Sequence, residues 1–229
     1  MGMRTGNFAG VDWGIKDVAL VFIARVLLVL AVSRLLLAPM QLNDYLSIQI
    51  LDSFILIGLV TSLLIWRRAS LINLFKPSDV SWTELITTGT LVGIALLLLG
   101  NWGEAWVNAH LMADLGPHPL YQLTVETDRL GQFIFPFLVG ALLVPLAEEL
   151  FYRGILYPPL QSKFGVVFGV IISGGLFALA HFDQAWVMEV FLVGVILTYL
   201  YHRFRSIIPG LIAHIILNGG RLIMIYLAL

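Results

Sequence analysis

Three short motifs place acids, histidines and an amide in the last third of a sequence that is otherwise mostly apolar. They are Glu148–Arg153 (EELFYR), Phe177–His181 (FALAH) and His214–Asn218 (HIILN). Ionisable side chains are costly at membrane depth, and those found there usually have partners and functions. Glutamate, histidine and asparagine are residue types that activate water and stabilise an oxyanion. The motifs therefore predict a hydrolytic site inside a membrane protein.

The 229-residue chain has the composition of a membrane protein. Hydrophobic residues make up 59% of it and charged residues only 12%, whereas soluble domains carry about 25% charged residues. The net charge of −1 argues against a nucleic-acid partner, which would require a basic surface. There is no cysteine, which excludes disulfides, thiolate metal sites and cysteine nucleophiles. The lipid bilayer is the first expected partner.

Apolar segments long enough to cross a bilayer, which takes roughly 20 residues, occur along the whole chain. We expect an all-α fold, a polytopic bundle of about seven transmembrane helices, with six to eight as the range. Residues 1–229 are expected to form a single membrane domain with a catalytic core at about 130–220. The predicted spans are 18–38, 46–66, 84–101, 132–157, 165–182, 186–202 and 207–227.

The distribution of arginine and lysine predicts the orientation. The connections after the second, fourth and sixth spans carry the basic residues, and the alternate connections carry mainly acids. Basic loops favour the cytoplasmic side. Because Arg4 and Lys16 fall on the basic side, the N-terminus is expected in the cytoplasm and the protein in the plasma (inner) membrane. With seven spans the C-terminus would lie outside.

The two glutamates of the first motif have different expected roles. Residues four apart share a helix face, so Glu149 can pair with Arg153, whereas Glu148 points about 100° away from Glu149. Glu149 and Arg153 are therefore expected to support the site structurally. Glu148, which has no such local partner, is the expected reactive carboxylate.

The fourth and fifth spans should bring Glu148 opposite His181. In antiparallel neighbours, residues equidistant from the turn lie at one level. The midpoint of positions 148 and 181 falls within 163–165, a Lys-Phe-Gly segment where a turn is expected. The two side chains should therefore face each other across the hairpin.

The depth of the site follows from where the helices end. Pro158–Pro159 should end the fourth span near Tyr157, which places Glu148 about 14 Å from the helix end. In the seventh span, His214 and Asn218 then lie at a compatible depth. We therefore expect these groups to converge in one layer, on the cytoplasmic half.

Two catalytic arrangements are compatible with these side chains. In the first, Glu148 is a general base that activates water with the help of His181. Hydrogen bonds from His214 and Asn218 would then stabilise the oxyanion. In the second, Zn²⁺ is bound by Glu148, His181 and His214, and polarises both water and the carbonyl group. Asparagine is a poor zinc ligand, so the metal-free arrangement is favoured and zinc is the alternative cofactor.

The three motifs resemble those of the CAAX-protease and bacteriocin-processing family of intramembrane proteases, also called the Abi family. The resemblance covers about residues 130–220 and implies an all-helical membrane endopeptidase, either glutamate-dependent or a metalloprotease. Its implied substrates are membrane-associated or C-terminal peptides, including lipidated and membrane-anchored proteins. It also implies that Glu148 and His181 activate water and that His214 and Asn218 stabilise the oxyanion. The remaining matched residues are Glu149 and Arg153, which would hold the site in shape, and Phe177.

Two other functions are compatible with polar groups in a helix bundle. A non-catalytic membrane adaptor or chaperone could keep the same fold, but it would not need both histidines and Asn218. A transporter or proton relay could use Glu148 and His181. Transporters often contain internal repeats, and this sequence shows none.

Other charged residues in the spans are expected to pair. Arg25 with Asp52 is one expected pair. Arg221 is expected to pair with Glu189 or Glu149, in preference to clamping a substrate carboxylate. The segment 173–175 (Ser-Gly-Gly) is expected to permit a close approach of two helices.

Overall fold

The computed structural model describes residues 13–42, 44–75, 80–110, 117–124, 129–181 and 185–228. Within these ranges the chain is helical without a β-strand, which confirms the predicted all-α class. Three of the helices named η are π-helical (η1, η3 and η4), and η2 is a 3-10 helix. In chain order the elements are α1 (Ile15–Val32), η1 (Ser33–Leu37), α2 (Tyr45–Trp66), α3 (Ile72–Phe75), α4 (Trp82–His110), η2 (Pro119–Leu123), α5 (Leu130–Leu138), η3 (Val139–Leu143), α6 (Val144–Glu148), η4 (Glu149–Leu156), α7 (Tyr157–Leu179), α8 (Val187–Phe204) and α9 (Ile208–Ala228).

Long apolar helices dominate this architecture. A bilayer core offers no hydrogen-bond partners, so a backbone that crosses it must satisfy its own polar groups, and a helix does this. The longest apolar helical stretch, Leu130–Leu179, has 50 residues. This exceeds the roughly 20 residues of one crossing, and the stretch contains most of the predicted fourth and fifth spans. Within the described residues, six stretches are long and apolar enough to cross a membrane: Ile15–Leu37, Tyr45–Trp66, Trp82–Val107, Leu130–Leu179, Val187–Phe204 and Ile208–Ala228.

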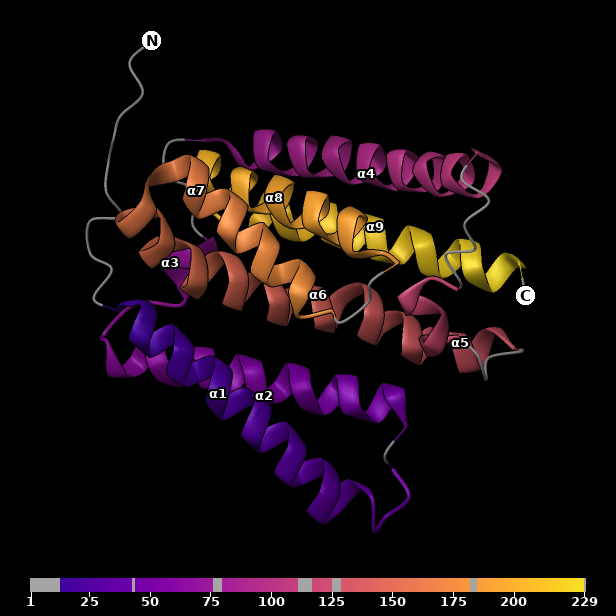
Figure 1. Cartoon of the computed structure of the whole chain (residues 1–229), viewed down its shortest axis with the longest axis horizontal. Helices are drawn as coiled ribbons and strands as arrows, with labels where there is room; N and C mark the ends of the chain where they lie inside the picture. Colours follow the sequence, from indigo (N-terminus) through magenta and orange to yellow (C-terminus); the bar gives the residue numbers. More distant parts are fainter. Residues whose placement is uncertain are drawn as a thin grey trace.

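The longest stretch turns back on itself at Gly165. This residue has φ 77° and ψ 177°, a backbone conformation that glycine adopts without steric strain. The two arms meet closely beside the turn, since a Cβ atom on Gly169 would lie 3.0 Å from Gln161 Cα. The reversal is visible where α7 changes direction in Figure 1. The predicted turn within 163–165 is therefore confirmed.

The predicted end of the fourth span near Tyr157 was wrong. The helix continues through Pro158–Pro159, which occupy the first turn of α7 directly after the π-helical η4. A proline at that position removes no required hydrogen bond, and the wider π turn precedes it. Glu148 is consequently 17 positions before Gly165, or about 25 Å along a helix rather than about 14 Å. The site does not lie near the helix end where it was expected.

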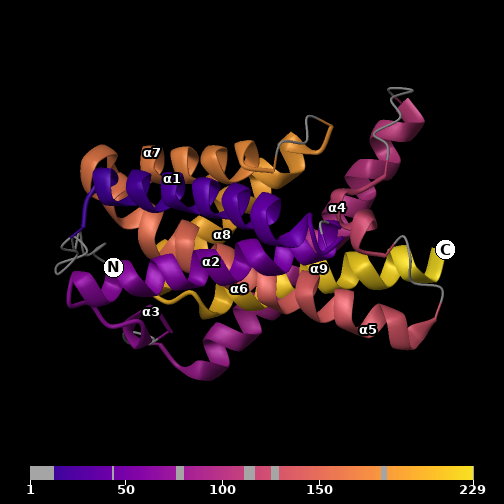
Figure 2. The same cartoon turned by 90° about the horizontal axis from the view of Figure 1, so that it is seen from below.

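Most of the long helices run in roughly one direction in Figure 1, and α1 lies obliquely to them. In that view α4 forms one edge, α1 and α2 form the other, and the remaining long helices lie between them. Figure 2, turned by 90°, shows α4 crossing the bundle at an angle. The most extensive helix–helix contacts are those of α4 with α9, α7 with α8, and α1 with α2. In the view of Figure 1, the motif-bearing helices α6, α7 and α9 thus lie between α4 and the α1–α2 pair.

Small residues allow two of these helix pairs to approach closely. A Cβ atom on Gly89 of α4 would lie 2.7 Å from the Pro209 carbonyl oxygen of α9. A Cβ atom on Gly174 of α7 would lie 2.8 Å from the Val195 backbone nitrogen of α8. Close contacts of this kind stabilise helix pairs in lipid, where no hydrophobic force acts between them. The close approach predicted at 173–175 is confirmed at Gly174.

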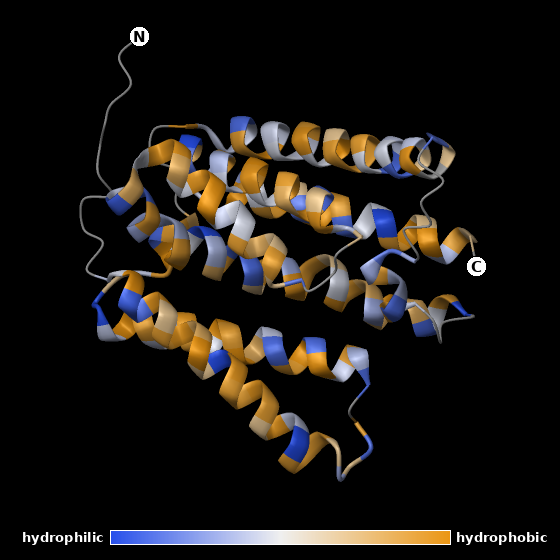
Figure 3. Ribbon diagram, viewed as in Figure 1, coloured by the Kyte–Doolittle hydropathy of each residue, from blue (hydrophilic) through white to orange (hydrophobic). Residues whose placement is uncertain are grey.

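The outer surfaces of the helices are apolar. Leu27 of α1 is 61% exposed, Leu98 of α4 is 63% exposed and Phe168 of α7 is 65% exposed. The hydropathy colouring in Figure 3 shows apolar residues along the helices, with hydrophilic positions mostly at helix ends and in the interior. Such a distribution suits a protein whose outside contacts lipid.

Candidate active site

The glutamate motif lies on a stretch of irregular helix. The short α6 separates two π-helical segments, η3 before it and η4 after it. Pro145 sits in the first turn of α6 and has no N–H to donate, while the Val144 N–H bonds the Val139 carbonyl across a wide π turn. Single π turns occur frequently at functional sites. Here Glu148 ends α6 and Glu149 begins η4, so both glutamates lie at such a junction.

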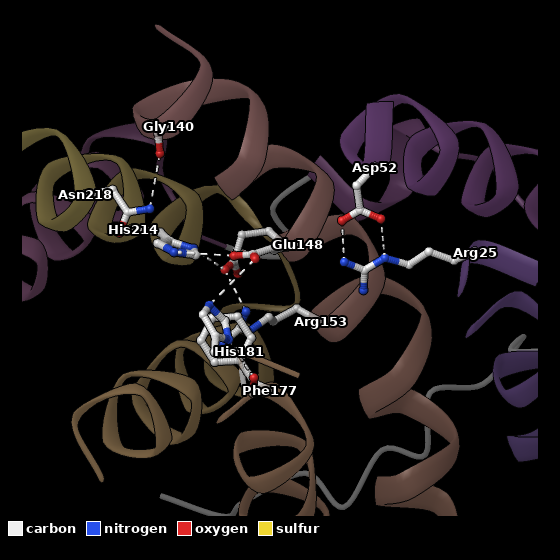
Figure 4. A network of polar contacts seen from close by, with 10 residues as sticks. Arg25, Asp52, Gly140, Glu148, Arg153, Phe177, His181, His214 and Asn218 are labelled. Atoms are coloured by element: carbon white, nitrogen blue, oxygen red, sulfur yellow. Dashed lines mark hydrogen bonds and ion pairs between the residues drawn. The ribbon is translucent and has the colours of Figure 1, made fainter. Parts of the chain in front are cut away.

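Glu148 faces both motif histidines. Its Oε1 lies 3.8 Å from His181 Nε2 and its Oε2 lies 3.7 Å from His214 Nε2. The side chain of Glu148 remains 14% exposed. Figure 4 shows the two rings converging on this carboxylate from α9 and from the end of α7. The predicted opposition of Glu148 and His181 is confirmed.

Glu149 is fully buried and supports two other motif residues. Its Oε1 accepts a hydrogen bond of 2.8 Å from Arg153 Nη1 and lies 3.0 Å from His214 Nδ1. The predicted Glu149–Arg153 pair is confirmed. The contact with His214 was not predicted, because the two residues are 65 positions apart and no local spacing rule connects them.

Arg153 and Phe177 form the inner layer beneath the glutamates. Arg153 Nη2 donates to the Gly194 carbonyl oxygen at 3.3 Å, and its guanidinium lies 4.5 Å from the Phe177 ring centroid. Both side chains are buried, with Phe177 only 1% exposed. A buried guanidinium requires compensation, which the carboxylate, the carbonyl and the ring face provide together. Within its motif, Phe177 thus provides the ring face that covers the Arg153 guanidinium.

The hydrogen bonds at Nδ1 determine the tautomer of each histidine. His181 Nδ1 lies 2.8 Å from the Phe177 carbonyl oxygen, which can only accept. His214 Nδ1 has a carboxylate partner in Glu149. Each Nδ1 therefore carries a proton, and in the neutral ring each Nε2 presents a lone pair toward Glu148.

The Glu148 carboxylate and the Nε2 atoms of the two histidines thus form a group of three hydrogen-bond acceptors that face one another. The separations of 3.7 and 3.8 Å are too long for direct hydrogen bonds. A water molecule could donate one proton to Glu148 and one to a ring nitrogen while keeping a lone pair for attack. A metal cation could also satisfy such a set of acceptors.

The donor set Glu148, His181 and His214 matches zinc chemistry in type. Within the described ranges, however, no group of three or more His, Cys, Asp or Glu side chains is arranged to hold a metal ion. The ring-to-carboxylate separations also exceed the roughly 3.3 Å between ligands that zinc bonds of about 2.0–2.1 Å give in a tetrahedron. Binding of zinc would require these side chains to move closer together.

Asn218 belongs to the same site. It lies one helical turn after His214 on α9, and its Nδ2 donates to the Gly140 carbonyl oxygen at 3.2 Å. Gly140 is part of the π-helical η3, where the usual helix hydrogen bonding is shifted. Among the residues that the structure describes, the second N–H of the Asn218 amide has no hydrogen-bond acceptor.

A cavity of about 320 Å³ joins these groups, since Glu148, His181, His214 and Asn218 all line it. A volume of this size is at the lower end of those that hold small ligands. Its lining extends beyond the motifs to α1, α2, the segment 117–124 and the start of α8.

Two arginines, each paired with carboxylates, form part of the cavity wall. Arg25 binds both carboxylate oxygens of Asp52, with Nε donating to Oδ1 at 2.6 Å. Arg221 donates to Glu104 at 2.6 Å and to Glu189 at 3.0 Å. The predicted pairs of Arg25 and Arg221 are confirmed, and Glu104 is an additional partner.

A protein-family model matches the segment of the chain that contains the site. Residues 130–220 match the family model described as type II CAAX prenyl endopeptidase Rce1-like. All three motifs fall within these residues. The predicted resemblance to the CAAX-protease and bacteriocin-processing family is therefore confirmed.

Two curated bacterial proteins are similar to parts of the chain. A Bacillus subtilis (strain 168) protein named "Putative membrane peptidase YdiL" is 28% identical over 87 residues, covering 38% of this chain and 36% of that protein. The "UPF0177 protein YxdF" of Lactococcus lactis subsp. lactis (strain IL1403) is 33% identical over 103 residues, covering 42% of this chain and 56% of that protein. The chain thus spans about a third and just over half of the lengths of these relatives. No solved structure matches it.

The comparisons and the helices agree at the level of the protein class. A membrane-peptidase family and six apolar helices together identify an integral membrane protein. The chain is similar to CAAX-type membrane peptidases in the segment that contains the site.

Proposed function

We propose that the protein is an intramembrane endopeptidase that hydrolyses peptide bonds of membrane-associated or C-terminal peptide substrates. These include lipidated or membrane-anchored proteins. The observation that carries the proposal is the position of the Glu148 carboxylate, 3.7–3.8 Å from the Nε2 atoms of two histidines. The similarity to CAAX-type endopeptidases supports it.

Glu148 acts as the general base in this proposal. Water bound between the carboxylate and His181 Nε2 transfers a proton to Glu148 as its oxygen attacks the peptide carbonyl carbon. The proton then moves to the leaving amine nitrogen as the C–N bond breaks. The products are a new carboxylate and a new amine, so no further reactant is required.

Asn218 and His214 stabilise the oxyanion of the tetrahedral intermediate. Asn218 contributes the N–H that is not bonded to Gly140. His214 can donate from Nε2 only as an imidazolium, because its Nδ1 proton is directed at Glu149. The neutral ring must therefore take up one proton from solvent at Nε2 before it can serve as this donor.

Zinc remains the alternative cofactor, and it would be held by Glu148, His181 and His214. When bound there, the ion would polarise water and the substrate carbonyl. Metal analysis of the active protein tests this alternative. Activity without stoichiometric metal, and unaffected by a chelator, is the result we expect. Stoichiometric zinc that is lost in His181→Ala and His214→Ala would overturn the metal-free mechanism.

We also propose that the protein lies in the plasma (inner) membrane with its N-terminus in the cytoplasm. Arg67 at the end of α2, Lys163 beside the Gly165 turn and Arg203 at the end of α8 all belong to the basic connections. The start of α1 lies on the same side, since Arg67 Nη2 binds Asp17 Oδ1 at 2.6 Å. Reporter fusions at Lys16 and Lys163 should therefore give the same cytoplasmic signal.

The experiment for the activity uses the purified full chain in liposomes and a pool of internally quenched peptides. Half of the pool carries an S-farnesyl cysteine and the matched half does not. Mass spectrometry in ¹⁸O-water should show one ¹⁸O in each new C-terminal carboxylate. Peptide binding without any cleavage across the pool would instead support the adaptor alternative.

A further inference from the structure

A third histidine, His118, lines the same cavity as Glu148. It belongs to the segment 117–124, which lies outside residues 130–220 and thus outside the match to the family model. His118 directly precedes η2 and has extended backbone angles, φ −57° and ψ 143°. The proposed mechanism does not use this residue.

The tautomer of His118 is determined by its own backbone. The Leu120 N–H donates to His118 Nδ1 at 3.2 Å, so Nδ1 has a lone pair and Nε2 of the neutral ring carries the proton. Burial, together with the charge of Arg221 and the proximity of His181, lowers the pKa of His118 to about 3. The ring is therefore neutral across the physiological pH range.

The ring is also held in orientation. It packs edge-on against Trp186, with ring centroids 4.7 Å apart at an interplanar angle of 67°. In the part of the chain that the structure describes, His118 Nε2 has no hydrogen-bond partner. The Nε2–H of His118 is thus an uncharged donor that forms no hydrogen bond with the described residues, on a residue that lines the cavity.

The two arginines in the cavity wall are already bound to carboxylates. Arg25 is paired with Asp52, and Arg221 with Glu104 and Glu189. Neither is available as a free cation for a substrate carboxylate. The uncharged Nε2–H of His118 is therefore suited to binding a neutral acceptor. Every peptide carries such an acceptor in its backbone carbonyl groups.

We propose that His118 is a substrate-binding residue whose Nε2–H donates to a backbone carbonyl of the peptide in the cavity. The segment 117–124 then forms a subsite that positions the peptide relative to Glu148. This inference rests on the proposed peptidase function. It adds a contact to the substrate and leaves the reacting groups unchanged.

Two substitutions separate binding from structure at this position. The amide oxygen of His118→Asn lies near the position of Nδ1 and can accept from the Leu120 N–H, but the side chain is too short to replace Nε2–H. The amide nitrogen of His118→Gln reaches the position of Nε2 and can donate, but it does not reproduce the cap on Leu120. The probe is the peptide that wild type cleaves fastest from the quenched pool.

We expect His118→Asn to raise KM about three- to tenfold with little change in kcat, as for the loss of one net hydrogen bond. His118→Gln should remain within about twofold of wild type in KM. The dissociation constant of the same peptide, measured by fluorescence anisotropy in a Glu148→Gln background, should change in parallel.

If His118→Asn kept the wild-type KM and His118→Gln raised it, His118 would only cap η2, and the inference would be overturned. Equal impairment of both variants, or no effect in either, would overturn it as well. None of these results would affect the proposed hydrolysis, which depends on Glu148. Conversely, cleavage by Glu148→Gln would contradict the catalytic proposal whatever the His118 variants show.

Discussion

Glu149 Oε1 lies 3.0 Å from His214 Nδ1, and this contact joins the first and third motifs. Glu148 approaches the opposite nitrogen of the same ring at 3.7 Å. One imidazole thus lies between two carboxylates with separate tasks. Glu149 determines the tautomer, and Glu148 faces the lone pair that results.

Glu149→Gln should impair both folding and turnover. The amide cannot compensate the charge of buried Arg153, and removing one partner of a buried pair costs about 3–5 kcal/mol. The substitution also removes the carboxylate that accepts the hydrogen bond from His214 Nδ1. We expect a clear loss of thermal stability and at least a tenfold loss of kcat. Wild-type kcat in folded protein would contradict the assigned role.

Arg153→Lys should not substitute for arginine. Lysine keeps the charge, but it cannot at once bind Glu149, donate to the Gly194 carbonyl and cover the face of Phe177. We expect a destabilisation of about 1–2 kcal/mol, as for the loss of one or two buried hydrogen bonds. Thermal unfolding in a fixed detergent measures it, with Arg203→Lys at the end of α8 as the matched control. An equal effect of the two substitutions would count against the buried role of Arg153.

Gly174→Ala should separate α7 from α8 and disturb the position of His181. The new methyl would lie 2.6 Å from Val195 Cγ2 and 2.8 Å from the Val195 backbone nitrogen. Overpacking of this kind costs about 1–3 kcal/mol. Gly175→Ala is the matched control, because nothing lies within 4 Å of a Cβ there. Melting temperature and kcat should fall in the first variant only, and a similar fall in both would contradict the close packing.

Arg221→Gln distinguishes a structural ion pair from a clamp for a substrate carboxylate. The substitution leaves Glu104 and Glu189 without their cation, so we expect reduced stability. The ratio of cleavage rates for a peptide with a free C-terminal carboxylate and its C-terminal amide should stay unchanged. A selective loss of cleavage of the free-carboxylate peptide would show that Arg221 binds substrate.

The sequence predicted those parts of the site that depend on short-range spacing or symmetry. The Glu149–Arg153 pair follows from an i, i+4 spacing. The opposition of Glu148 and His181 follows from a midpoint that falls next to Gly165. The Arg25–Asp52 pair follows from the cost of leaving either charge alone in an apolar span.

The remaining features depend on helix irregularity and on distant contacts. Pro158 was expected to end a helix, and it does not, because the prolines follow directly after a π-helical segment. The contact between Glu149 and His214 depends on how α9 packs against η4. His118 carries no motif, and its place in the cavity follows only from the path of the segment 117–124.

Cleavage by Glu148→Gln tests the central claim most directly. The control is Glu84→Gln, which removes an exposed carboxylate from the first turn of α4. Both proteins are reconstituted in liposomes at equal amounts after their melting temperatures are shown to match wild type. We predict that Glu148→Gln loses at least a thousandfold in kcat/KM for the quenched peptide, whereas Glu84→Gln stays within twofold of wild type. Near wild-type cleavage by Glu148→Gln would contradict the proposal that this carboxylate activates the water.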